Sequence, residues 1–304
     1  FNALNTHGYE LELVEAFLND DNVDAAKGFD AVMVRGNCKA SKENLEKLHR
    51  YGVKTLLTRT VGFNHIDLET LKALNMNAAR VPSYSPNAIA ELAVTKAMML
   101  LRNTAYMVNK SKDLDFTVDG SMFSKEIRTC KVGIIGLGKI GFTAAKLFKG
   151  LGAEVIAYDP YENDDFKSVV SYQSFETVLK ESDVISIHMP YFKGKNDHVI
   201  NKETLSLVKE DAILVNTSRG ELIDLDAVLT KIENGTLKGF AADVIENEPS
   251  IFFKKHDNTK DPMLNRIKAL YPKVLFTPHI GSFTDEALRN MIETSYENLA
   301  DFIA

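Results

Sequence analysis

Tryptophan is absent from this chain of 304 residues, and cysteine is nearly so, because Cys38 and Cys130 are its two members. Two cysteines without metal-ligand spacing argue against a disulfide framework or a metal site, and they favour a reducing cytoplasm. No apolar run approaches the ~20 residues of a membrane-spanning helix, and no signal peptide is visible. Basic residues number 36 against 42 acidic ones and form no cluster, so neither a membrane nor a nucleic acid is expected as a partner.

The length of the chain exceeds that of one typical hydrophobic core, and its patterns predict two α/β regions. In the first region, strands are predicted at 10–14, 31–34 and 55–58, and helices at 22–27 and 42–50. Strands that alternate with helices predict a parallel sheet. Residues 1–8 have the pattern of the end of a helix, so we expect further residues before Phe1.

A proline-containing linker at residues 81–87 leads into a helix predicted at 87–102. This helix is apolar nearly all round, which predicts burial either between domains or against a second copy of the chain. The second region has strands predicted at 131–135, 154–159, 184–188, 212–216, 239–243 and 274–277. A last helix, from about Thr284, is predicted to return to the first region.

A glycine-rich turn follows the first strand of the second region. Gly136, Gly138 and Gly141 are spaced G-x-G-x-x-G between a β-branched apolar run and an amphipathic helix. The first glycine permits the tight turn, the second lets a pyrophosphate approach the backbone, and the third brings helix and strand together. Free N–H groups at the start of the helix face the phosphate. Glycine triplets also mark ordinary turns, but this strand–helix context predicts a dinucleotide site.

An acidic residue at the end of the next strand, Asp159, indicates which dinucleotide is bound. A carboxylate at this position accepts hydrogen bonds from the ribose 2′-hydroxyl and repels a 2′-phosphate. No arginine or lysine directly follows it. The sequence therefore favours NAD over NADP, with a simple turn-forming role for Asp159 as the alternative.

Three further side chains follow strands of the second region, and ligands of open parallel sheets bind at that edge. They are Arg219, Glu248 and His279. An arginine can hold a substrate carboxylate in a bidentate fork, and a histidine can protonate the alkoxide that hydride transfer leaves on a carbonyl carbon. A carboxylate beside that histidine favours its imidazolium form. Alone, each could be a surface ion-pair partner, a solvated acid or a structural histidine; together they predict a 2-oxo-acid reductase.

Several segments resemble the signatures of the D-isomer-specific 2-hydroxyacid dehydrogenases, and residues 81–91 resemble the D-lactate dehydrogenase branch. The segments are the glycine turn at 136–141 with Asp159, and residues 216–224, 243–249 and 277–281. The resemblance covers nearly the whole chain. It implies a homodimer of two-domain α/β subunits. Residues 84–281 would be a Rossmann-type NAD-binding domain with a doubly wound parallel sheet. Residues 1–83 and 282–304 would form a smaller, flavodoxin-like substrate domain whose first strand is missing from the sequence.

The same resemblance implies roles for individual residues. Arg219 would bind and orient the substrate, Glu248 would support the histidine, and His279 would be the general acid/base. The residues implied at the NAD site are Gly136, Gly138, Lys139, Ile140, Gly141, Asp159, Met189, Pro190, Asn196, Thr217, Ser218 and Asp243, the last of them near the nicotinamide carboxamide. In the substrate domain, backbone N–H groups of Val61 and Gly62 would bind the substrate carboxylate, and Tyr84 would border the pocket.

One arginine in the first region points to a particular substrate. Arg35 follows a predicted buried strand. The resemblance to D-lactate dehydrogenases implies a tyrosine or another uncharged residue at the matching position. An unpaired guanidinium buried in a pocket for a methyl group would cost roughly several kcal/mol, as other unpaired buried polar groups do. A second carboxylate on the substrate would pair with the guanidinium and remove that cost. Residues 34–38, 122–126 and 281–286 resemble the (R)-2-hydroxyglutarate dehydrogenases, and Ser282 would leave room for a longer substrate. The sequence therefore favours 2-oxoglutarate.

Other substrates and functions stay open at this point. If Arg35 instead pairs with an acid of the protein, pyruvate or a branched or aromatic 2-oxo acid is favoured. An NAD(H)-sensing interaction protein, similar to the transcriptional corepressors of the same scaffold, is a further alternative, although no partner-binding tail is visible. Phosphoglycerate or formate oxidation is disfavoured, because the regulatory domain of the former and the extra pocket groups of the latter cannot be located.

Overall fold

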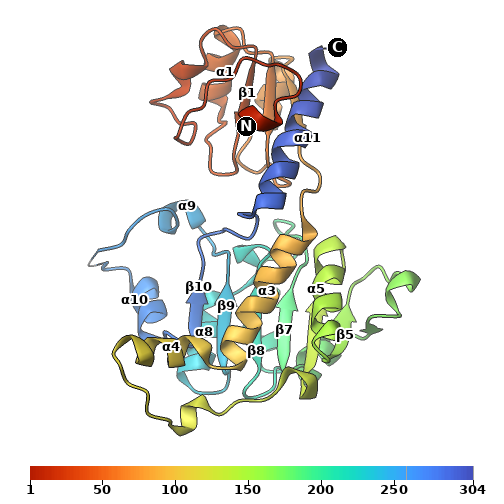
Figure 1. Cartoon of the computed structure of the whole chain (residues 1–304), viewed down its shortest axis with the longest axis vertical. Coiled ribbons are helices and arrows are strands. Elements are labelled where there is room, and N and C mark those ends of the chain that lie inside the picture. The colour runs from red at the N-terminus through yellow and green to blue at the C-terminus, as the bar shows by residue number, and fades with distance from the viewer. Residues whose placement is uncertain (258, 304) are drawn as a thin grey trace. The chain divides into compact units, whose positions relative to one another are not determined.

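The computed structural model describes residues 1–257 and 259–303, and its chain forms two compact units (Figure 1). The smaller unit comprises residues 1–85 together with the C-terminal segment that begins at Phe283. The larger unit comprises Pro86–Ser282. These boundaries lie within two residues of the ones that the sequence suggested.

A seven-stranded sheet of parallel strands forms the centre of the larger unit. Its strands are β4 (Lys131–Ile135), β5 (Glu154–Tyr158), β6 (Ser171–Tyr172), β7 (Val184–Ile187), β8 (Ile213–Asn216), β9 (Gly239–Ala242) and β10 (Val274–Phe276). They lie in the order β10-β9-β8-β7-β4-β5-β6. The chain therefore reverses direction across the sheet between β4 and β7, which is the point where a doubly wound sheet binds its ligand.

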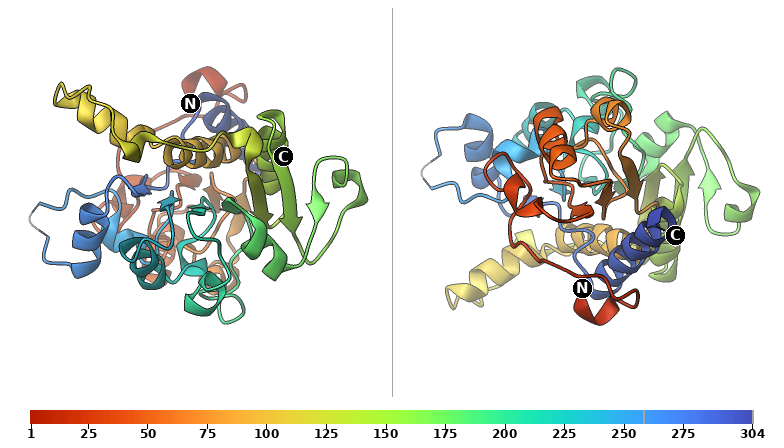
Figure 2. Two further views of the ribbon diagram at one scale, coloured as in Figure 1. Left: turned by 90° about the horizontal axis from the view of Figure 1, so that it is seen from below. Right: turned by 90° about the horizontal axis from the view of Figure 1, so that it is seen from above.

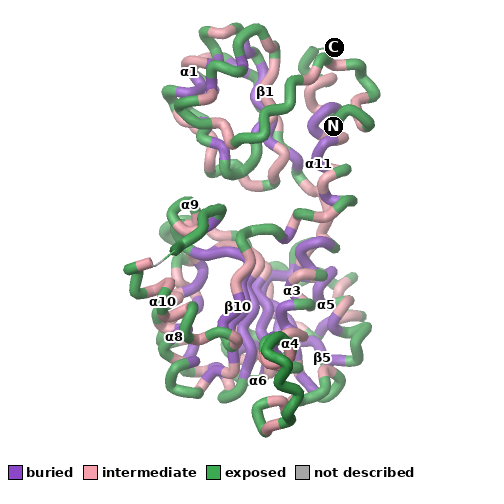
Figure 3. The backbone as a smooth tube through the Cα atoms, turned by 60° about the vertical axis from the view of Figure 1, so that its left-hand side comes forward, coloured by how far each residue is buried: buried purple, intermediate pink, exposed green. Residues whose placement is uncertain are grey.

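Helices cover both faces of this sheet (Figure 2). They are α3 (Pro86–Leu101), α4 (Thr104–Lys112), α5 (Lys139–Gly150), α6 (Phe175–Glu181), α7 (Lys202–Leu205), α8 (Leu225–Glu233), α9 (Glu248–Ile251) and α10 (Pro262–Ala269). Successive strand residues alternate between the two cores: Ile134 packs with α3 and α5, whereas Ile135 packs with α6 and α8. Because both faces are covered, the central strands are buried along their length (Figure 3).

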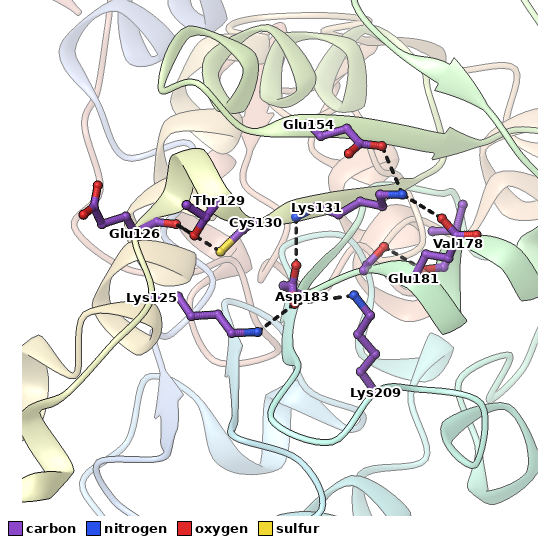
Figure 4. A network of polar contacts seen from close by, with 11 residues as sticks. Lys125, Glu126, Thr129, Cys130, Lys131, Glu154, Val178, Glu181, Asp183 and Lys209 are labelled. Carbon is purple, nitrogen blue, oxygen red and sulfur yellow. Dashed lines mark hydrogen bonds and ion pairs between the residues drawn. The ribbon is translucent and has the colours of Figure 1, made fainter.

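A charged network closes the amino-terminal edge of the larger sheet, as Figure 4 shows. One carboxylate oxygen of Asp183 lies 3.0 Å from Lys125 Nζ and 3.5 Å from Lys209 Nζ. Its other oxygen accepts the N–H of Lys131 at 2.8 Å. Burial alone would raise the pKa of Asp183, but the Lys131 amide and the lysine charges outweigh it and lower that pKa. Ligands of open parallel sheets bind at the opposite, carboxyl edge.

The smaller unit has a three-stranded parallel sheet in the order β1-β2-β3. Its elements are β1 (Ala31–Val34), α1 (Lys42–Arg50), β2 (Thr55–Thr58), α2 (Leu68–Ala73), β3 (Asn77–Arg80) and α11 (Asp285–Ile303). Leu45, Leu48 and Leu56 are fully buried in its core. Helix α11 packs against β2 and β3, so the last segment of the chain belongs to the same fold as the first.

Three predictions near the amino terminus are wrong. Residues 10–14 form no strand, and residues 1–8 and 22–27 contain single 3₁₀ turns, Asn2–Leu4 and Val23–Ala26, instead of α-helix. A strand requires a hydrogen-bonded neighbour, whereas Leu13 and Val14 are half exposed and residues 9–18 line a cavity of about 1170 Å³ beside β1. The two helical patterns are too short to be stable as α-helices without packing.

None of the helices in the described part of the chain has the length and apolarity that crossing a bilayer requires. Both cysteines, Cys38 and Cys130, are free and buried. Within the same residues, no group of three or more histidine, cysteine or acidic side chains is placed to hold a metal ion.

Candidate active site

The three glycines between β4 and α5 have different structural requirements. Gly136 has a φ of +92°, and a Cβ there would lie 2.5 Å from the backbone nitrogen of Met189. A Cβ on Gly141 would lie 2.0 Å from the carbonyl oxygen of Gly136, so helix and strand approach too closely for any side chain. Gly138, in contrast, faces open space. The turn therefore leaves room for a ligand above Gly138, in front of the unpaired N–H groups that begin α5.

Asp159, which follows β5, stabilises this turn through its carboxylate. Its Oδ2 accepts the N–H of Leu137 at 2.7 Å, and its Oδ1 accepts the N–H of Tyr161 at 2.9 Å. The side chain is half exposed, and each carboxylate oxygen retains acceptor capacity. Asp159 can therefore hold the glycine turn and also accept a ribose hydroxyl.

Residues that follow β7 and β8 lie at the same edge of the sheet as the glycine turn. Met189 lies against Gly136, while Asn196 accepts the N–H of Phe192 at 2.7 Å and donates to the carbonyl of Pro190 at 2.8 Å. Asn196 thus shapes the loop with both ends of its amide. After β8, the buried hydroxyl of Thr217 has no hydrogen-bond partner among the described residues. An orphaned buried hydroxyl is expected where a ligand supplies the missing partner.

His279 and Glu248 are brought together at the carboxyl edge of the larger sheet. Nδ1 of His279 lies 2.7 Å from Oε2 of Glu248, while Oε1 of Glu248 accepts the N–H of Ile245 at 3.3 Å. Nε2 of the same imidazole has no partner among the described residues, and 41% of the side chain is exposed. His279 also has a positive φ of 53°, a conformation that costs free energy and is concentrated at functional sites.

Asp243, which follows β9, holds the segment that carries His279. Its Oδ1 accepts the N–H of Ile280 at 3.0 Å and the hydroxyl of Thr277, and its Oδ2 accepts the N–H of Gly281 at 2.7 Å. The side chain is 2% exposed. Because hydrogen bonds on both sides of His279 converge on one buried carboxylate, the imidazole is held at a fixed place at the sheet edge.

Arg219 lies in the loop after β8, at the same edge. Gly220 is packed so closely that a Cβ there would lie 2.1 Å from the backbone of Ile245, which fixes the loop beside the segment before Glu248. Asn216 donates to the carbonyl of Arg219 at 2.8 Å and accepts the N–H of Ser218 at 3.0 Å. The guanidinium is half buried and donates to the carbonyl of Ser218, with no ion pair in the described chain. Its remaining donors are available to an anion.

The smaller unit places its own candidate residues at the carboxyl ends of its strands. Arg35 directly follows β1 and is exposed, and Val61 and Gly62 lie in the loop after β2. Tyr84 follows β3, and its carbonyl accepts a hydrogen bond from Asn290 of α11 at 2.6 Å.

Sequence reasoning missed two charged residues. Arg59 directly follows β2, and Lys96 is buried in α3 with 3% of its surface exposed. Lys96 could have been noticed as the charged residue inside the apolar run of that helix. Arg59 gave a weaker signal, since a charged residue at a strand end is ordinary.

Comparisons with known proteins agree with this geometry. Residues 94–281 match the family model of the D-isomer specific 2-hydroxyacid dehydrogenase NAD binding domain. The chain belongs to the D-isomer-specific 2-hydroxyacid dehydrogenases. It is 36% identical over 299 residues to the aromatic 2-oxoacid reductase of Clostridium sporogenes, covering 97% of this chain and 89% of that protein. It is 38% identical over 296 residues to the D-lactate dehydrogenase of Lactiplantibacillus plantarum, with the same 97% and 89% coverage.

Solved structures give the same result. The D-lactate dehydrogenase with NAD⁺ from Lactobacillus jensenii superposes with a TM-score of 0.84 at 38% identity, covering 100% of this chain and 91% of that one. This dehydrogenase is therefore an NAD-dependent oxidoreductase with a Rossmann-type NAD-binding domain. The space above Gly138 and the orphaned hydroxyl of Thr217 fit that cofactor.

Two alanine substitutions separate cofactor binding from folding in the glycine turn. Gly138→Ala is expected to keep the melting temperature, because its Cβ meets open space, and to weaken NADH binding at least about tenfold by obstructing the pyrophosphate. Gly141→Ala is expected to destabilise the fold by about 1–3 kcal/mol, because its Cβ meets backbone. Thermal unfolding and NADH fluorescence titration measure the two effects. Equal behaviour of the two variants would contradict this division.

Proposed function

We propose that this D-2-hydroxyacid dehydrogenase interconverts 2-oxoglutarate and (R)-2-hydroxyglutarate. The proposal depends on one observation in the smaller unit, which is a pair of guanidinium groups without a carboxylate partner among the described residues. A substrate with a second carboxylate supplies the missing negative charge, whereas pyruvate does not. We further propose that the smaller unit, residues 1–85 and the segment from Phe283, is the substrate domain.

Arg35 and Arg59 occupy equivalent positions on adjacent strands. In the parallel ladder, Val34 of β1 pairs with Thr58 of β2, and the two arginines come next in each strand. The N–H of Arg59 also donates to the carbonyl of Val34 at 3.1 Å. Burial, and next the positive charge of Arg35, lower the pKa of Arg59. The two cations therefore act on each other at one end of the sheet.

No acidic side chain in the described residues forms an ion pair with either arginine. Arg35 lies 5.0 Å from the ring centroid of Phe17, and Arg59 lies 4.9 Å from that of Phe1. Aromatic rings attract cations but do not neutralise them. An ion pair between Arg35 and an acid of the protein was the alternative that favoured a monocarboxylate, and this contact is missing from the described structure. The unneutralised pair supports a dicarboxylate substrate.

The loop after β2 supports binding of the carboxylate beside the 2-oxo group. Arg80 donates to the carbonyl of Val61 at 2.7 Å, and the hydroxyl of Thr60 donates to the carbonyl of Gly62 at 2.6 Å. In a trans peptide the N–H points away from the preceding carbonyl. With the carbonyls held in this way, the N–H of Gly62 has no acceptor in the described chain and can bind an anion. We propose that this loop, with Tyr84 at its border, binds that carboxylate. We propose separately that Arg219 of the larger unit binds and orients the substrate.

His279 is proposed as the general acid for reduction. When bound, NADH would supply the hydride that adds to the carbonyl carbon of the 2-oxo acid and leaves its oxygen as an alkoxide. The imidazolium transfers the proton of Nε2 to the alkoxide oxygen and keeps its Nδ1 proton on Glu248. Glu248, at 2.7 Å, stabilises the imidazolium before transfer. In the oxidative direction the neutral ring removes the hydroxyl proton through the same Nε2.

A panel of 2-oxo acids tests the proposed substrate. The value of kcat/KM for NADH oxidation is expected to be at least about 100-fold higher with 2-oxoglutarate than with pyruvate, since pyruvate leaves two cations unpaired. 4-Methyl-2-oxopentanoate has a branched chain without the second carboxylate, and phenylpyruvate corresponds to the aromatic activity for which the Clostridium sporogenes relative is named. Preference for either, or for pyruvate, would contradict the proposal.

We also propose that the enzyme is a homodimer that works in the cytoplasm. Helix α4 and the segment after it expose large apolar side chains, namely Val108, Leu114, Phe116, Val118 and Phe123. An ion-paired cluster around Lys110, with Asp115 and Asp119, holds this segment in shape. Exposed apolar patches commonly mark protein interfaces. The free, buried cysteines are consistent with a reducing compartment.

A further inference from the structure

A lysine is buried beneath the carboxyl edge of the larger sheet, where none of the proposed catalytic steps uses it. Lys96 lies on α3 and is 3% exposed. Its Nζ donates to the carbonyl oxygen of Ala242, the last residue of β9, at 3.0 Å. Ile89 and Leu92 lie on the same face of α3 at helical spacing, and both are neighbours of Gly281. This face of α3 therefore underlies the end of β9 and the segment that carries His279.

The charged group that acts on this ammonium is the carboxylate of Asp243, the residue after Ala242. Burial lowers the pKa of Lys96 to about 8, and the negative charge of Asp243 opposes that shift. Two other elements pack on α3 near this lysine. Strand β8 ends in Asn216, which is buried and uncharged, and helix α5 carries Lys146, which is exposed. Arg219, Glu248 and His279 are further titratable groups at this edge. His279 contacts Glu248, and Asp243 holds the segment that carries His279.

We propose that Lys96 sets the relative affinity of this enzyme for the oxidised and the reduced nicotinamide. The oxidised ring carries a positive charge and the reduced ring carries none. A buried ammonium at the end of β9 therefore disfavours NAD⁺ relative to NADH, and loss of its proton removes that bias. The proposal depends on a nicotinamide site near Asp243. It does not depend on which 2-oxo acid is the substrate.

The direction of the pH dependence follows from the charge of Lys96. Below pH 8 the ammonium is mostly present, so the ratio Kd(NAD⁺)/Kd(NADH) is high. As the pH rises through about 8, the positive charge of Lys96 is lost, and the ratio falls. With an effective dielectric constant of about 20, loss of one nearby unit charge is expected to change the ratio about tenfold.

Two substitutions distinguish the charge of Lys96 from its hydrogen bond. Lys96→Met removes both, whereas Lys96→Gln keeps a donor for the Ala242 carbonyl and removes the charge. Fluorescence and calorimetric titration of NADH and NAD⁺ at pH 7 are expected to show an about tenfold lower Kd(NAD⁺)/Kd(NADH) in both variants. Lys180→Met, at an exposed position of α6, changes the net charge equally and should leave the ratio unchanged.

A pH titration of the wild-type side chain provides the second measurement. In a His279→Ala background, which removes the imidazole at the same edge of the sheet, the ratio should fall between pH 7 and pH 9. The same step should be missing when Lys96 is replaced. A constant ratio across that range, or a wild-type ratio in Lys96→Gln, would overturn the proposal. Equal weakening of both cofactor forms in Lys96→Gln, with an unchanged ratio, would also overturn it.

Discussion

Replacing His279 with alanine is expected to lower kcat for 2-oxo-acid reduction by about 10²–10⁴-fold, the usual contribution of a general acid. The imidazole is held at Nδ1 by Glu248 and leaves Nε2 open to deliver a proton. Because the ring is not part of the protein core, its removal should not affect folding. The affinity for NADH should change by less than about twofold, since the glycine turn and Asp159 are distant in the fold from this substitution. Stopped-flow turnover and NADH fluorescence give the two values.

The chain contains a matched control for this experiment. His198 and Glu246 form a second histidine–glutamate pair, at 3.0 Å, with both side chains about half exposed. His198→Ala should leave kcat within about twofold of the wild-type value, as expected of an exposed ion pair. Glu248→Gln should give an intermediate loss, because the imidazolium loses its counter-charge and retains a neighbour of similar shape. If His279→Ala retained turnover, another group would have to be the acid.

Replacing Arg35 with alanine is expected to reduce kcat/KM for 2-oxoglutarate by about 30- to 1000-fold, mostly through KM. This range corresponds to about 2–4 kcal/mol for a charge-assisted contact with a carboxylate. Pyruvate has no group for Arg35, so its kcat/KM should be unchanged or higher. Steady-state kinetics with both substrates, at saturating NADH, measure the change in preference.

Arg50→Ala is the control for the loss of one positive charge in the same unit. Arg50 is exposed at the end of α1 and makes no ion pair in the described chain, so its removal should alter neither substrate. Arg59→Ala is expected to resemble Arg35→Ala in direction, because the two guanidinium groups face the same end of the sheet. Equal losses on 2-oxoglutarate and pyruvate in Arg35→Ala would show that Arg35 supports the fold or the shared reaction instead of the second carboxylate.

Local patterns were sufficient for the strongly apolar elements. β1 and β2 and helix α1 have the predicted limits, and the six predicted strands of the larger sheet differ from the observed ones by one residue at most. The two-residue edge strand β6 was not predicted. Strands buried on both faces have continuous apolar runs, and glycine and capping residues mark their ends, so short-range information is enough. The glycine turn was predictable for the same reason, since Gly136 requires a positive φ.

Elements that depend on distant partners were not predictable in this way. Residues 10–14 have a strand-like pattern, but no neighbouring strand pairs with them in the described structure. Lys96 lies in a helix whose composition predicts an uncharged interior, and its role follows from the approach of α3 to Ala242 and Asp243. Such contacts join residues nearly 150 positions apart, and no local pattern encodes them.

The sequence by itself determined the fold class, the NAD cofactor and the dehydrogenase family, because glycine spacing, strand composition and the polar residues after each strand are local properties. Only the tertiary structure decided which polar groups meet. It placed Glu248 2.7 Å from His279, set Asp243 as the acceptor that holds the histidine segment, and left Arg35 and Arg59 without a carboxylate partner in the described chain. Contact between side chains depends on how strands register and helices pack, and these interactions are spread over the whole sheet.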